Sequence, residues 1–445
     1  MQAVILAGGI GKRISPLGIN KPKAMFRVAG KSIIEHVMDN IKQAGISIRE
    51  LVIVTSPGEN SIRNYLGNGE RFGFDLKYAI QEKPLGQANA LLSARDFVSE
   101  DMLVLNANDI YDHRLLSELV QLGQGEALDV ALVGREVTEP NKFGVMKLNS
   151  VRKVVGVVEK PEKGEEPSNI AVVGLYYFSP KIWDGLDSTP IGKTDDQFER
   201  AYQKLICPTG NDFISYNGPF ETYKYSWDLF AINDLFLSQI TEYRVDPSAR
   251  ISPTAIVDKN VIIEANVRVL EYAVVRGPAY IGAGTIIGNH TLIRGGVSIG
   301  QNCVVGHSTE VTRSIIGDNS WFHKNFIGDS IISDNCSFGA GTITANLRFN
   351  EALVRVKVGE ERISSGRKYF GVIMAENCRT GCNAVLLPGT KVGPNAVVGP
   401  GVVLRDTLGA GKMALLPKDS YVIEENSVDL ENISRSEQMK ALKGS

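Results

Sequence analysis

The sequence predicts two structural units, an α/β domain followed by a parallel β-solenoid. From Ile251 to Val311 a β-branched residue recurs every six positions, and a small or branched residue stands four positions after most of them. In the first 243 residues, short apolar runs alternate with amphipathic segments of helical period. A strict six-residue period is typical of short stacked strands with stiff, inward-pointing side chains. Alternating strands and helices indicate an α/β sheet instead, and 445 residues exceed one ordinary core.

Four apolar runs in the first unit are predicted to be buried parallel strands. They are Ala3–Leu6, Leu51–Thr55, Met102–Leu105 and Asp129–Val133. Between the first two, Ser32 and Glu35 have the spacing of a capping box, which predicts a helix that Gly45 ends. A further amphipathic helix is expected over Asp228–Tyr243. We expect helices on both faces of the sheet.

The solenoid is predicted to span residues 244–417, after an α/β domain over 1–243. Its period slips to five residues near Ile316, Phe322 and Ile327 and resumes at Leu386. An all-β sandwich would not keep one period over such a length, so the solenoid is favoured. The polar tail over 418–445 is expected to be a short helix or partly disordered.

Charge and composition argue against several function classes. The chain has 48 basic and 50 acidic residues and a net charge of −2, so no surface for nucleic acid or an anionic membrane is predicted. The N-terminus lacks a signal-peptide pattern, and the apolar runs are too short to span a bilayer. Five cysteines, an odd number, do not indicate a disulfide framework. We therefore expect a soluble cytoplasmic protein.

A glycine-rich segment directly follows the first predicted strand. It reads Ala7-Gly8-Gly9-Ile10-Gly11-Lys12-Arg13, and Lys21-Pro22-Lys23 comes soon after it. Glycines at the end of a strand let backbone N–H groups approach phosphates, and the basic side chains add positive charge. The spacing fits neither the dinucleotide fingerprint nor a P-loop. Taken alone, the glycines are explained equally well by a tight turn.

With these segments the first half resembles the sugar-1-phosphate nucleotidylyltransferases. Their pattern of LAGG.G.R followed by a K-P-K-like segment is matched by Leu6–Arg13 and Lys21–Lys23. Three further segments resemble glucose-1-phosphate thymidylyltransferases, namely Tyr65–Leu91, Glu159–Pro161 and Ser168–Phe178. The resemblance implies a Rossmann-like nucleotidyltransferase domain that joins a nucleoside triphosphate to a sugar 1-phosphate and releases pyrophosphate.

The resemblance also implies a role for individual residues. Those holding the triphosphate would be Leu6, Ala7, Gly8, Gly9, Gly11 and Arg13. Lys23 would contact the reacting phosphates and act in catalysis together with Arg13, while Gln81 and Gly86 would read a pyrimidine base. The sugar pocket would be lined by Glu159, Lys160 and Gly174. The carboxylates that hold one Mg²⁺ against the phosphates would be Asp109 and Asp228.

Several positions depart from the family pattern. Asn108 stands before Asp109 where the family usually has Gly, and Gln87 replaces a small or aliphatic residue. Val172 and Val173 replace an Asn of the uridylyltransferases and a Thr of the thymidylyltransferases, respectively. A pyrimidine nucleotide is favoured, but UTP and dTTP both stay open, as do N-acetylglucosamine 1-phosphate and glucose 1-phosphate.

The solenoid carries a second resemblance at its register break. Trp321–Ser330, Phe338–Phe349 and Ile363–Gly371 are similar to the acetyltransferase domain of archaeal-type bifunctional N-acetylglucosamine-1-phosphate uridylyltransferases. This implies a left-handed parallel β-helix, assembled as a homotrimer or a dimer of trimers. It also implies His323 as the catalytic base and Asn346 as a sugar-binding residue.

The implied second reaction takes acetyl-CoA as co-substrate and acetylates an amino-sugar 1-phosphate in a cleft between subunits. A neutral imidazole can accept the proton of the attacking amine near pH 7. The residues expected to meet the phosphates of CoA are Arg362, Arg367 and Lys368. Phe326 in place of the family's Tyr, and Ser337 in place of its Asn, remove two polar contacts to the amino sugar.

Three hypotheses follow. The chain is a bifunctional enzyme, or a monofunctional nucleotidylyltransferase (for thymidylyl, uridylyl or guanylyl transfer) whose β-helix serves assembly or regulation, or a non-catalytic binding subunit. Arg13, Lys23, Asp109 and Asp228 argue against the last. His323 favours the first over the second.

Overall fold

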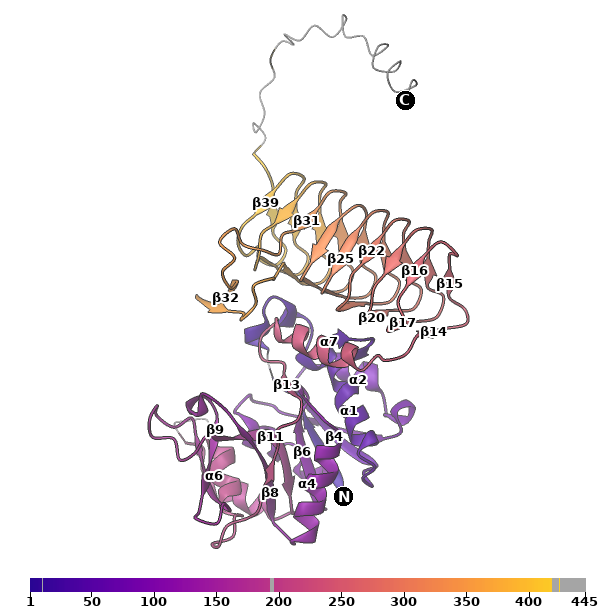
Figure 1. The fold of residues 1–445 in the computed structure, drawn as a ribbon. Coiled ribbons are helices and arrows are strands. Elements are labelled where there is room, and N and C mark those ends of the chain that lie inside the picture. The colour runs from indigo at the N-terminus through magenta and orange to yellow at the C-terminus, as the bar shows by residue number, and fades with distance from the viewer. Residues whose placement is uncertain (10, 193–195, 418–423, 425–445) are drawn as a thin grey trace, which may run out of the picture.

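The computed structural model describes residues 1–9, 11–192, 196–417 and 424. It has two parts, a β-helix lying across one side of an α/β domain, with helix α7 (Asp228–Ser238) at the junction between them (Figure 1). Apart from Glu424, the predicted tail lies outside the described residues, and so does Ile10 of the glycine-rich loop. Among the described residues, none of the helices is long and apolar enough to cross a membrane.

The α/β domain is built on a nine-stranded mixed sheet. Seven strands follow in the order β10 (Val154–Glu159), β9 (Gly144–Leu148), β11 (Ile170–Phe178), β6 (Met102–Asn106), β1 (Gln2–Leu6), β4 (Glu50–Thr55) and β5 (Asp75–Ile80). Two more branch from β11, namely β8 (Val130–Glu136) and then β12 (Ile214–Ser215). Strands β6, β1, β4 and β5 are parallel. The remaining pairings of β11 are antiparallel.

Helices cover both faces of this sheet, as predicted. The helices are α1 (Ile33–Gln43), α2 (Ser61–Leu66), α3 (Gln87–Leu92), α4 (Arg114–Gly125), α5 (Ile182–Asp187), α6 (Gln197–Gln203) and α7. In β1, Ala3 and Ile5 join the core beneath α1, α4 and α7, whereas Val4 and Leu6 join the core beneath α3, α5 and α6. Alternate side chains of one strand therefore build two cores, which explains why the predicted strands read as continuous apolar runs.

The predicted elements are confirmed with two differences. Ser32 caps α1, and Glu35 closes the capping box by accepting a hydrogen bond from the Ser32 backbone N–H at 2.7 Å. The run at Asp129–Val133 forms β8, which runs in the direction of β1 but is separated from the parallel strands by antiparallel β11. Helix α7 ends at Ser238, not Tyr243, because the chain must turn there to enter the β-helix.

The second half is a three-sided β-helix, and each side is a parallel sheet. The first side, which faces the α/β domain, comprises β14 (Arg244–Val245), β17 (Val261–Ile263), β20 (Ala279–Ile281), β23 (Val297–Ile299), β26 (Ile315–Ile316), β29 (Ile331–Ile332), β34 (Ile373–Met374) and β37 (Lys391–Val392). The second side comprises β15 (Arg250–Ile251), β18 (Arg268–Val269), β21 (Ile286–Ile287), β24 (Val304–Val305), β27 (Trp321–Phe322), β30 (Ser337–Phe338), β35 (Arg379–Thr380), β38 (Val397–Val398) and β40 (Met413–Ala414). The third side comprises β16 (Ile256–Val257), β19 (Val274–Val275), β22 (Leu292–Ile293), β25 (Glu310–Thr312), β28 (Phe326–Gly328), β31 (Ile343–Thr344), β36 (Val385–Leu386) and β39 (Val403–Leu404).

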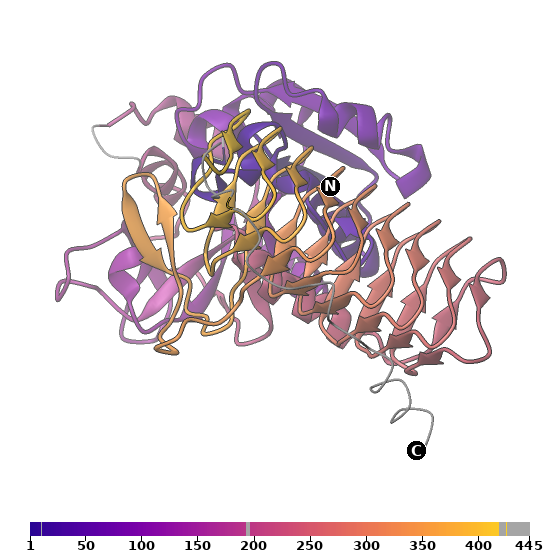
Figure 2. The same cartoon turned by 90° about the horizontal axis from the view of Figure 1, so that it is seen from above.

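The predicted register slip is a shortened coil. Val261 pairs with Ala279, 18 residues further on, whereas Ile315 pairs with Ile331, 16 residues further on. After β31 the chain leaves the β-helix to form a hairpin of β32 (Arg355–Val358) and β33 (Glu361–Ser364) and returns at β34. Seen from above, this hairpin projects beside the stack of coils (Figure 2).

The two halves share one core. Ile315 and Ile331 of the first side belong to the same buried cluster as Leu229 of α7, and Phe370 after the hairpin packs edge-on against Phe230 at 5.7 Å between ring centroids. Two smaller pairs complete the α/β domain at this junction, β2 (Arg27–Val28) with β3 (Lys31–Ser32) and β7 (Asp109–Tyr111) with β13 (Phe220–Thr222).

The β-helix interior predicts a large loss of stability for Phe338→Ala. Phe338 is 0% exposed and stacks on Phe322 of the preceding coil at 4.8 Å. Removing a buried aromatic ring costs about 3–5 kcal/mol of unfolding free energy, measurable as a shift in chemical denaturation. Met413→Ala is the matched control, because Met413 is 61% exposed on the outer face of the second side. An equal shift for both variants would contradict the assignment of the interior.

Candidate functional site

The glycine-rich loop opens into a cavity at the carboxyl end of β1. The cavity has a volume of about 330 Å³ and is lined by Leu6, Gly8, Gly9, Gln81, Pro84, Gly86, Gln87, Ala90, Asn106 and Asn108. Its walls come from the ends of β1, β5 and β6 and from the start of α3, since ligand sites of open α/β sheets lie outside the carboxyl ends of the strands. Five residues expected from the sequence to bind the nucleotide thus lie around one space.

Gly8 is required by a close approach to Gln81. A Cβ atom on Gly8 would lie 2.7 Å from Gln81 Oε1. The buried Gln81 amide is fixed, because its Nε2 donates to the carbonyl of Gly86 at 3.1 Å and to Asn89 Oδ1 at 3.2 Å. One rigid amide, whose edge can hydrogen-bond a base, therefore lies directly against the loop.

Asp109 is buried beside this cavity, at the start of β7. Its Oδ1 accepts a hydrogen bond from Thr222 Oγ1 at 2.6 Å, and its Oδ2 accepts one from Asn106 Nδ2 at 2.9 Å. Gly174 of β11 makes room for this arrangement, because a Cβ atom there would lie 2.7 Å from Asp109 Oδ2. Burial raises the pKa of Asp109, and the two hydrogen bonds oppose that rise.

Asp228 is the first residue of α7 and is half-buried. Its Oδ2 accepts hydrogen bonds from the backbone N–H groups of Lys224 at 2.8 Å and Tyr225 at 2.5 Å. Burial raises the pKa of Asp228, while these hydrogen bonds and the charges of Lys23 and Lys224 oppose it. Its second oxygen takes no hydrogen bond from the described residues, which leaves one carboxylate oxygen for a cation.

Lys23 contacts the same short segment of chain as the two carboxylates. Its Nζ donates to the carbonyl of Tyr223 at 3.0 Å. Burial and then the charge of Arg13 lower the pKa of Lys23, whereas Asp228 and Asp109 both act to raise it. Thr222, which precedes Tyr223, donates its hydroxyl to Asp109, and Lys224, which follows Tyr223, donates its backbone N–H to Asp228. The structure therefore brings Lys23, Asp109 and Asp228 together around one short segment, and Arg13 is among the charges that act on Lys23.

Sequence reasoning missed three neighbours of these groups. Asn106 and Thr222 hold Asp109, and Lys224 adds a further cation beside Asp228. Burial lowers the pKa of Lys224, and the charge of Arg13 lowers it further. The signal for Asn106 was its place at the end of a buried strand, three residues before Asp109. Thr222 and Lys224 gave no comparable signal, because β13 is short and its pairing with β7 is long-range.

The expected sugar residues come from two places in the sheet, the end of β10 and the middle of β11. Glu159 ends β10 and forms an ion pair with Lys160, and the charge of Lys160 contributes to the lowered pKa of Lys224. Gly174 lies against Asp109, as described above.

The donor set fits a magnesium ion only together with a ligand. In the part of the chain that the structure describes, there is no group of three or more His, Cys, Asp and Glu residues able to hold a metal ion. Asp109 and Asp228 are two carboxylates whose pKa values burial raises. A site of one or two carboxylates completed by phosphate oxygens is the usual Mg²⁺ arrangement.

The second predicted site lies on a corner of the β-helix. His323 is exposed in the turn between β27 and β28. Its backbone N–H donates to Asn325 Oδ1 at 2.7 Å, and the buried Asn325 amide donates to the carbonyl of Gly339 at 2.8 Å. The imidazole is therefore presented on a turn that is braced by the next coil.

The structure does not place Asn346 beside His323 within one chain. Asn346 follows β31 and donates to Asp329 Oδ2 at 2.6 Å, so it lies at the far end of β28 from His323. Asp329 is fully buried and also accepts two hydrogen bonds from Arg313, both at 2.7 Å. Asn346 thus belongs to a partly exposed polar cluster around the buried Asp329, on the adjacent corner.

The three residues expected at CoA phosphates are also apart. Arg362 pairs with Asp406 at 3.1 Å, and Lys368 pairs with Glu351 at 2.5 Å. The Arg367 guanidinium lies 4.5 Å from the centre of the Phe230 ring in α7, so it faces the domain junction. Within one chain these cations do not form a single anion site.

Comparison with known proteins agrees with both halves of this description. The Nucleotidyl transferase family model matches residues 2–216, and the Bacterial transferase hexapeptide model matches residues 260–295 and 371–406. "Bifunctional protein GlmU" of Methanococcus maripaludis is 33% identical over 95% of this chain and 99% of its own length. The protein of that name from Methanocaldococcus jannaschii is 32% identical over 90% and 93%.

A "Bifunctional sugar-1-phosphate nucleotidylyltransferase/acetyltransferase" from Sulfurisphaera tokodaii is 28% identical over 93% of this chain and 99% of its own. Relatives that match along both halves of this chain are thus named as bifunctional proteins. This favours the hypothesis of two activities over that of a monofunctional nucleotidylyltransferase. The resemblances stated from the sequence are confirmed, and the chain belongs to the GlmU family of bifunctional transferases.

Proposed function

We propose that the α/β domain transfers a nucleotidyl group from UTP or dTTP to a sugar 1-phosphate, either N-acetylglucosamine 1-phosphate or glucose 1-phosphate, and releases pyrophosphate. The observation that carries this proposal is the convergence of Lys23, Asp109 and Asp228 on the segment 222–225, next to the glycine-rich loop. The sugar phosphate attacks the α-phosphate, so the reaction needs two anions held in line and no protein nucleophile.

The cationic, acidic and amide side chains of the site have different roles in this reaction. Lys23 and Arg13 offset the negative charge of the reacting phosphates and of the departing pyrophosphate. Asp109 and Asp228 would hold a Mg²⁺ ion, which supplies further positive charge to phosphate oxygens when bound. Gln81, with its amide fixed against Gly86, reads the edge of the base, and Glu159 and Lys160 bind the sugar. Immobilised donors and cations of this kind cost no reorganisation during the reaction.

We expect Asp109→Asn to lower the rate of pyrophosphate release by about 10²–10³-fold, because a fixed electrostatic group at the reacting phosphates is lost. The assay pairs four nucleoside triphosphates with several sugar 1-phosphates, which also identifies the base and the sugar. Asp112→Asn is the control, since Asp112 pairs with Arg114 away from the cavity. Full activity of Asp109→Asn would remove that carboxylate from the site.

We propose that the β-helix acetylates an amino-sugar 1-phosphate with acetyl-CoA, with His323 accepting the amine proton. The imidazole is exposed on a braced turn, where a substrate can reach it. Because Asn346 and the cations Arg362, Arg367 and Lys368 do not surround His323 within one chain, a complete site requires residues of another copy.

His323→Ala should lower CoA release from acetyl-CoA and glucosamine 1-phosphate by about 10²–10⁴-fold, the usual contribution of a general base. His307→Ala is the matched control, because His307 occupies the same corner one coil earlier. Pyrophosphate release should be unchanged in both variants. If CoA release survives in His323→Ala, another group takes the proton.

We propose a trimer assembled through the third side of the β-helix. Its outward positions pair from coil to coil and are apolar at all but one step, namely Ile256, Val274, Leu292, Glu310, Phe326, Ile343, Val385 and Val403. A partly exposed strip that is apolar on every coil but one is typical of an interface. Three such sides can pack around a cyclic axis and form a closed assembly. Phe326 in this strip directly neighbours the turn of His323.

Light scattering should give three times the 48.4 kDa chain mass for the native protein. Ile343→Glu buries a charge in the proposed interface and should yield monomers, since an unpaired buried charge is costly. Met413→Glu, on the second side and 61% exposed, is the control and should keep the native mass. A monomeric native protein would contradict the proposed assembly.

A further inference from the structure

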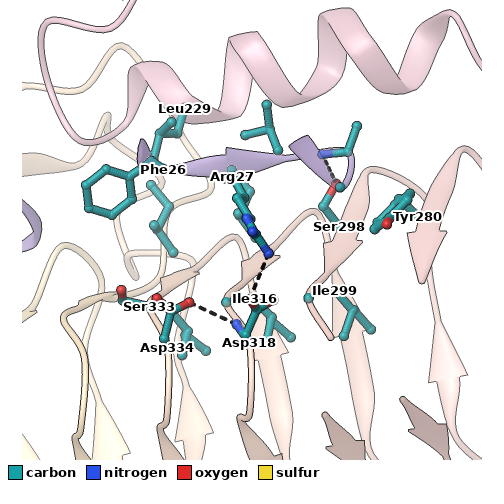
Figure 3. Close-up of a pocket in the computed structure, with 18 of the residues that line it drawn as sticks. Phe26, Arg27, Leu229, Tyr280, Ser298, Ile299, Ile316, Asp318, Ser333 and Asp334 are labelled. Carbon is teal, nitrogen blue, oxygen red and sulfur yellow. Dashed lines mark hydrogen bonds and ion pairs between the residues drawn. The ribbon is translucent and has the colours of Figure 1, made fainter. Parts of the chain in front are cut away.

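A row of acidic side chains on the β-helix forms ion pairs and a hydrogen bond with the chain segment that carries Lys23. The row lies on the corner between the first and second sides, one residue per coil. Asp318 pairs with Arg27 at 2.9 Å, Asp334 pairs with Lys21 at 2.7 Å, and Glu376 accepts a hydrogen bond from Asn20 at 2.6 Å. Figure 3 shows the corner, with Asp318 below Arg27 and Asp334 on the next coil.

The row is oriented before it meets the α/β domain. Oδ1 of Asp334 accepts a hydrogen bond from the backbone N–H of Asp318 at 2.9 Å, and Oδ1 of Asp318 accepts one from the backbone N–H of Gln301 at 2.8 Å. Asp318 and Asp334 therefore each use one oxygen to accept a hydrogen bond from the previous coil and present the other to a cation. Because the coils stack regularly, they hold these carboxylate oxygens at a fixed spacing.

The residues that contact this acidic row, Asn20, Lys21 and Arg27, lie on both sides of Lys23 in the sequence. Lys21 lies over the Phe26 ring at 5.2 Å, and Phe26 packs edge-on against Tyr223 at 5.8 Å. The carbonyl of Tyr223 is the group that accepts the hydrogen bond of Lys23 Nζ. A contact at Lys21 is thus separated from the Lys23 ammonium by one residue of chain and by one pair of rings.

We propose that Asp334 is a positioning residue for nucleotidyl transfer, acting through Lys21 to fix Lys23 at the reacting phosphates. The inference rests on the proposed role of Lys23. The two ion-paired side chains are 23% and 36% exposed, so the pair is partly screened from water and is directional rather than strongly stabilising. Its effect is on geometry, and a displacement of about 1 Å at a reacting group can cost about 10²-fold in rate.

The junction itself does not depend on this ion pair. Leu229, Ile315 and Ile331 bury apolar surface across it, and the backbone N–H of Ala29 donates to Ser298 Oγ at 3.1 Å. Removing the charge of Asp334 while keeping its shape should therefore leave the two halves docked. An effect on catalysis can then be separated from an effect on folding.

The test compares Asp334→Asn, Lys21→Met and the double variant in the full chain, with pyrophosphate release as the assay. Asn keeps the acceptor that bonds to Asp318 but loses the charge. We expect kcat to fall about tenfold in Asp334→Asn with little change in the KM for the nucleotide, because positioning acts on the transition state. The double variant should be no slower than Lys21→Met alone, since both remove one interaction. The thermal unfolding midpoint and CoA release should stay at the native values.

Asp258→Asn is the matched control, because Asp258 forms an exposed ion pair with Arg276 at 2.9 Å on an early coil. Native kcat in Asp334→Asn, or losses that add in the double variant, would overturn the proposal. If Asp334→Asn does not fold, Lys21→Met decides alone: a native kcat would overturn the proposal. Inactive native protein, or full activity in Lys23→Ala, would instead overturn the proposed function of the α/β domain.

Discussion

The buried charge arrangement around Lys23 is the constraint on which the rest of the structure depends. Two carboxylates and one ammonium group lie close together, Asp109 fully buried and the other two half-buried. Thr222 and Asn106 donate to Asp109, and backbone N–H groups donate to Asp228. Neutral donors fix the carboxylates without cancelling their charge, so they still attract a cation. These donors come from the end of β6, from β13 and from the turn that precedes α7.

The β-helix serves the protein by holding side chains at regular intervals. Every coil adds three corners, and a residue at the same corner of successive coils forms a row. One row carries the histidine turn, another carries Asp318 and Asp334, and the outer strip of the third side is apolar. Because each coil contacts only its neighbours, such rows can differ in chemistry while the interior stays unchanged.

Much of this was predictable from the sequence where patterns are local. The six-residue period, the capping box at Ser32 and the apolar runs predicted the two units and most elements, because each depends on neighbours along the chain. The antiparallel insertion of β11 and the early end of α7 were not predictable, since both depend on long-range packing. For the site, the motifs predicted the residues that the structure gathers around Lys23. They missed Thr222, whose partner Asp109 is 113 positions away. The roles of all these residues stay predictions.

The junction between the halves shows why one chain carries both units. The segment from Asn20 to Arg27 belongs to the α/β domain, yet its polar side chains end on three coils of the β-helix. A chain segment that presents an ammonium group to phosphates loses conformational entropy when it becomes ordered. If a rigid neighbour holds the segment, this entropy is lost during folding and not again when the nucleotide binds. The stacked coils offer such a neighbour, because backbone hydrogen bonds already fix the carboxylates of Asp318 and Asp334. An α/β domain without the β-helix would have to order this segment each time it bound a nucleotide. The β-helix therefore contributes to the geometry of the segment that carries Lys23.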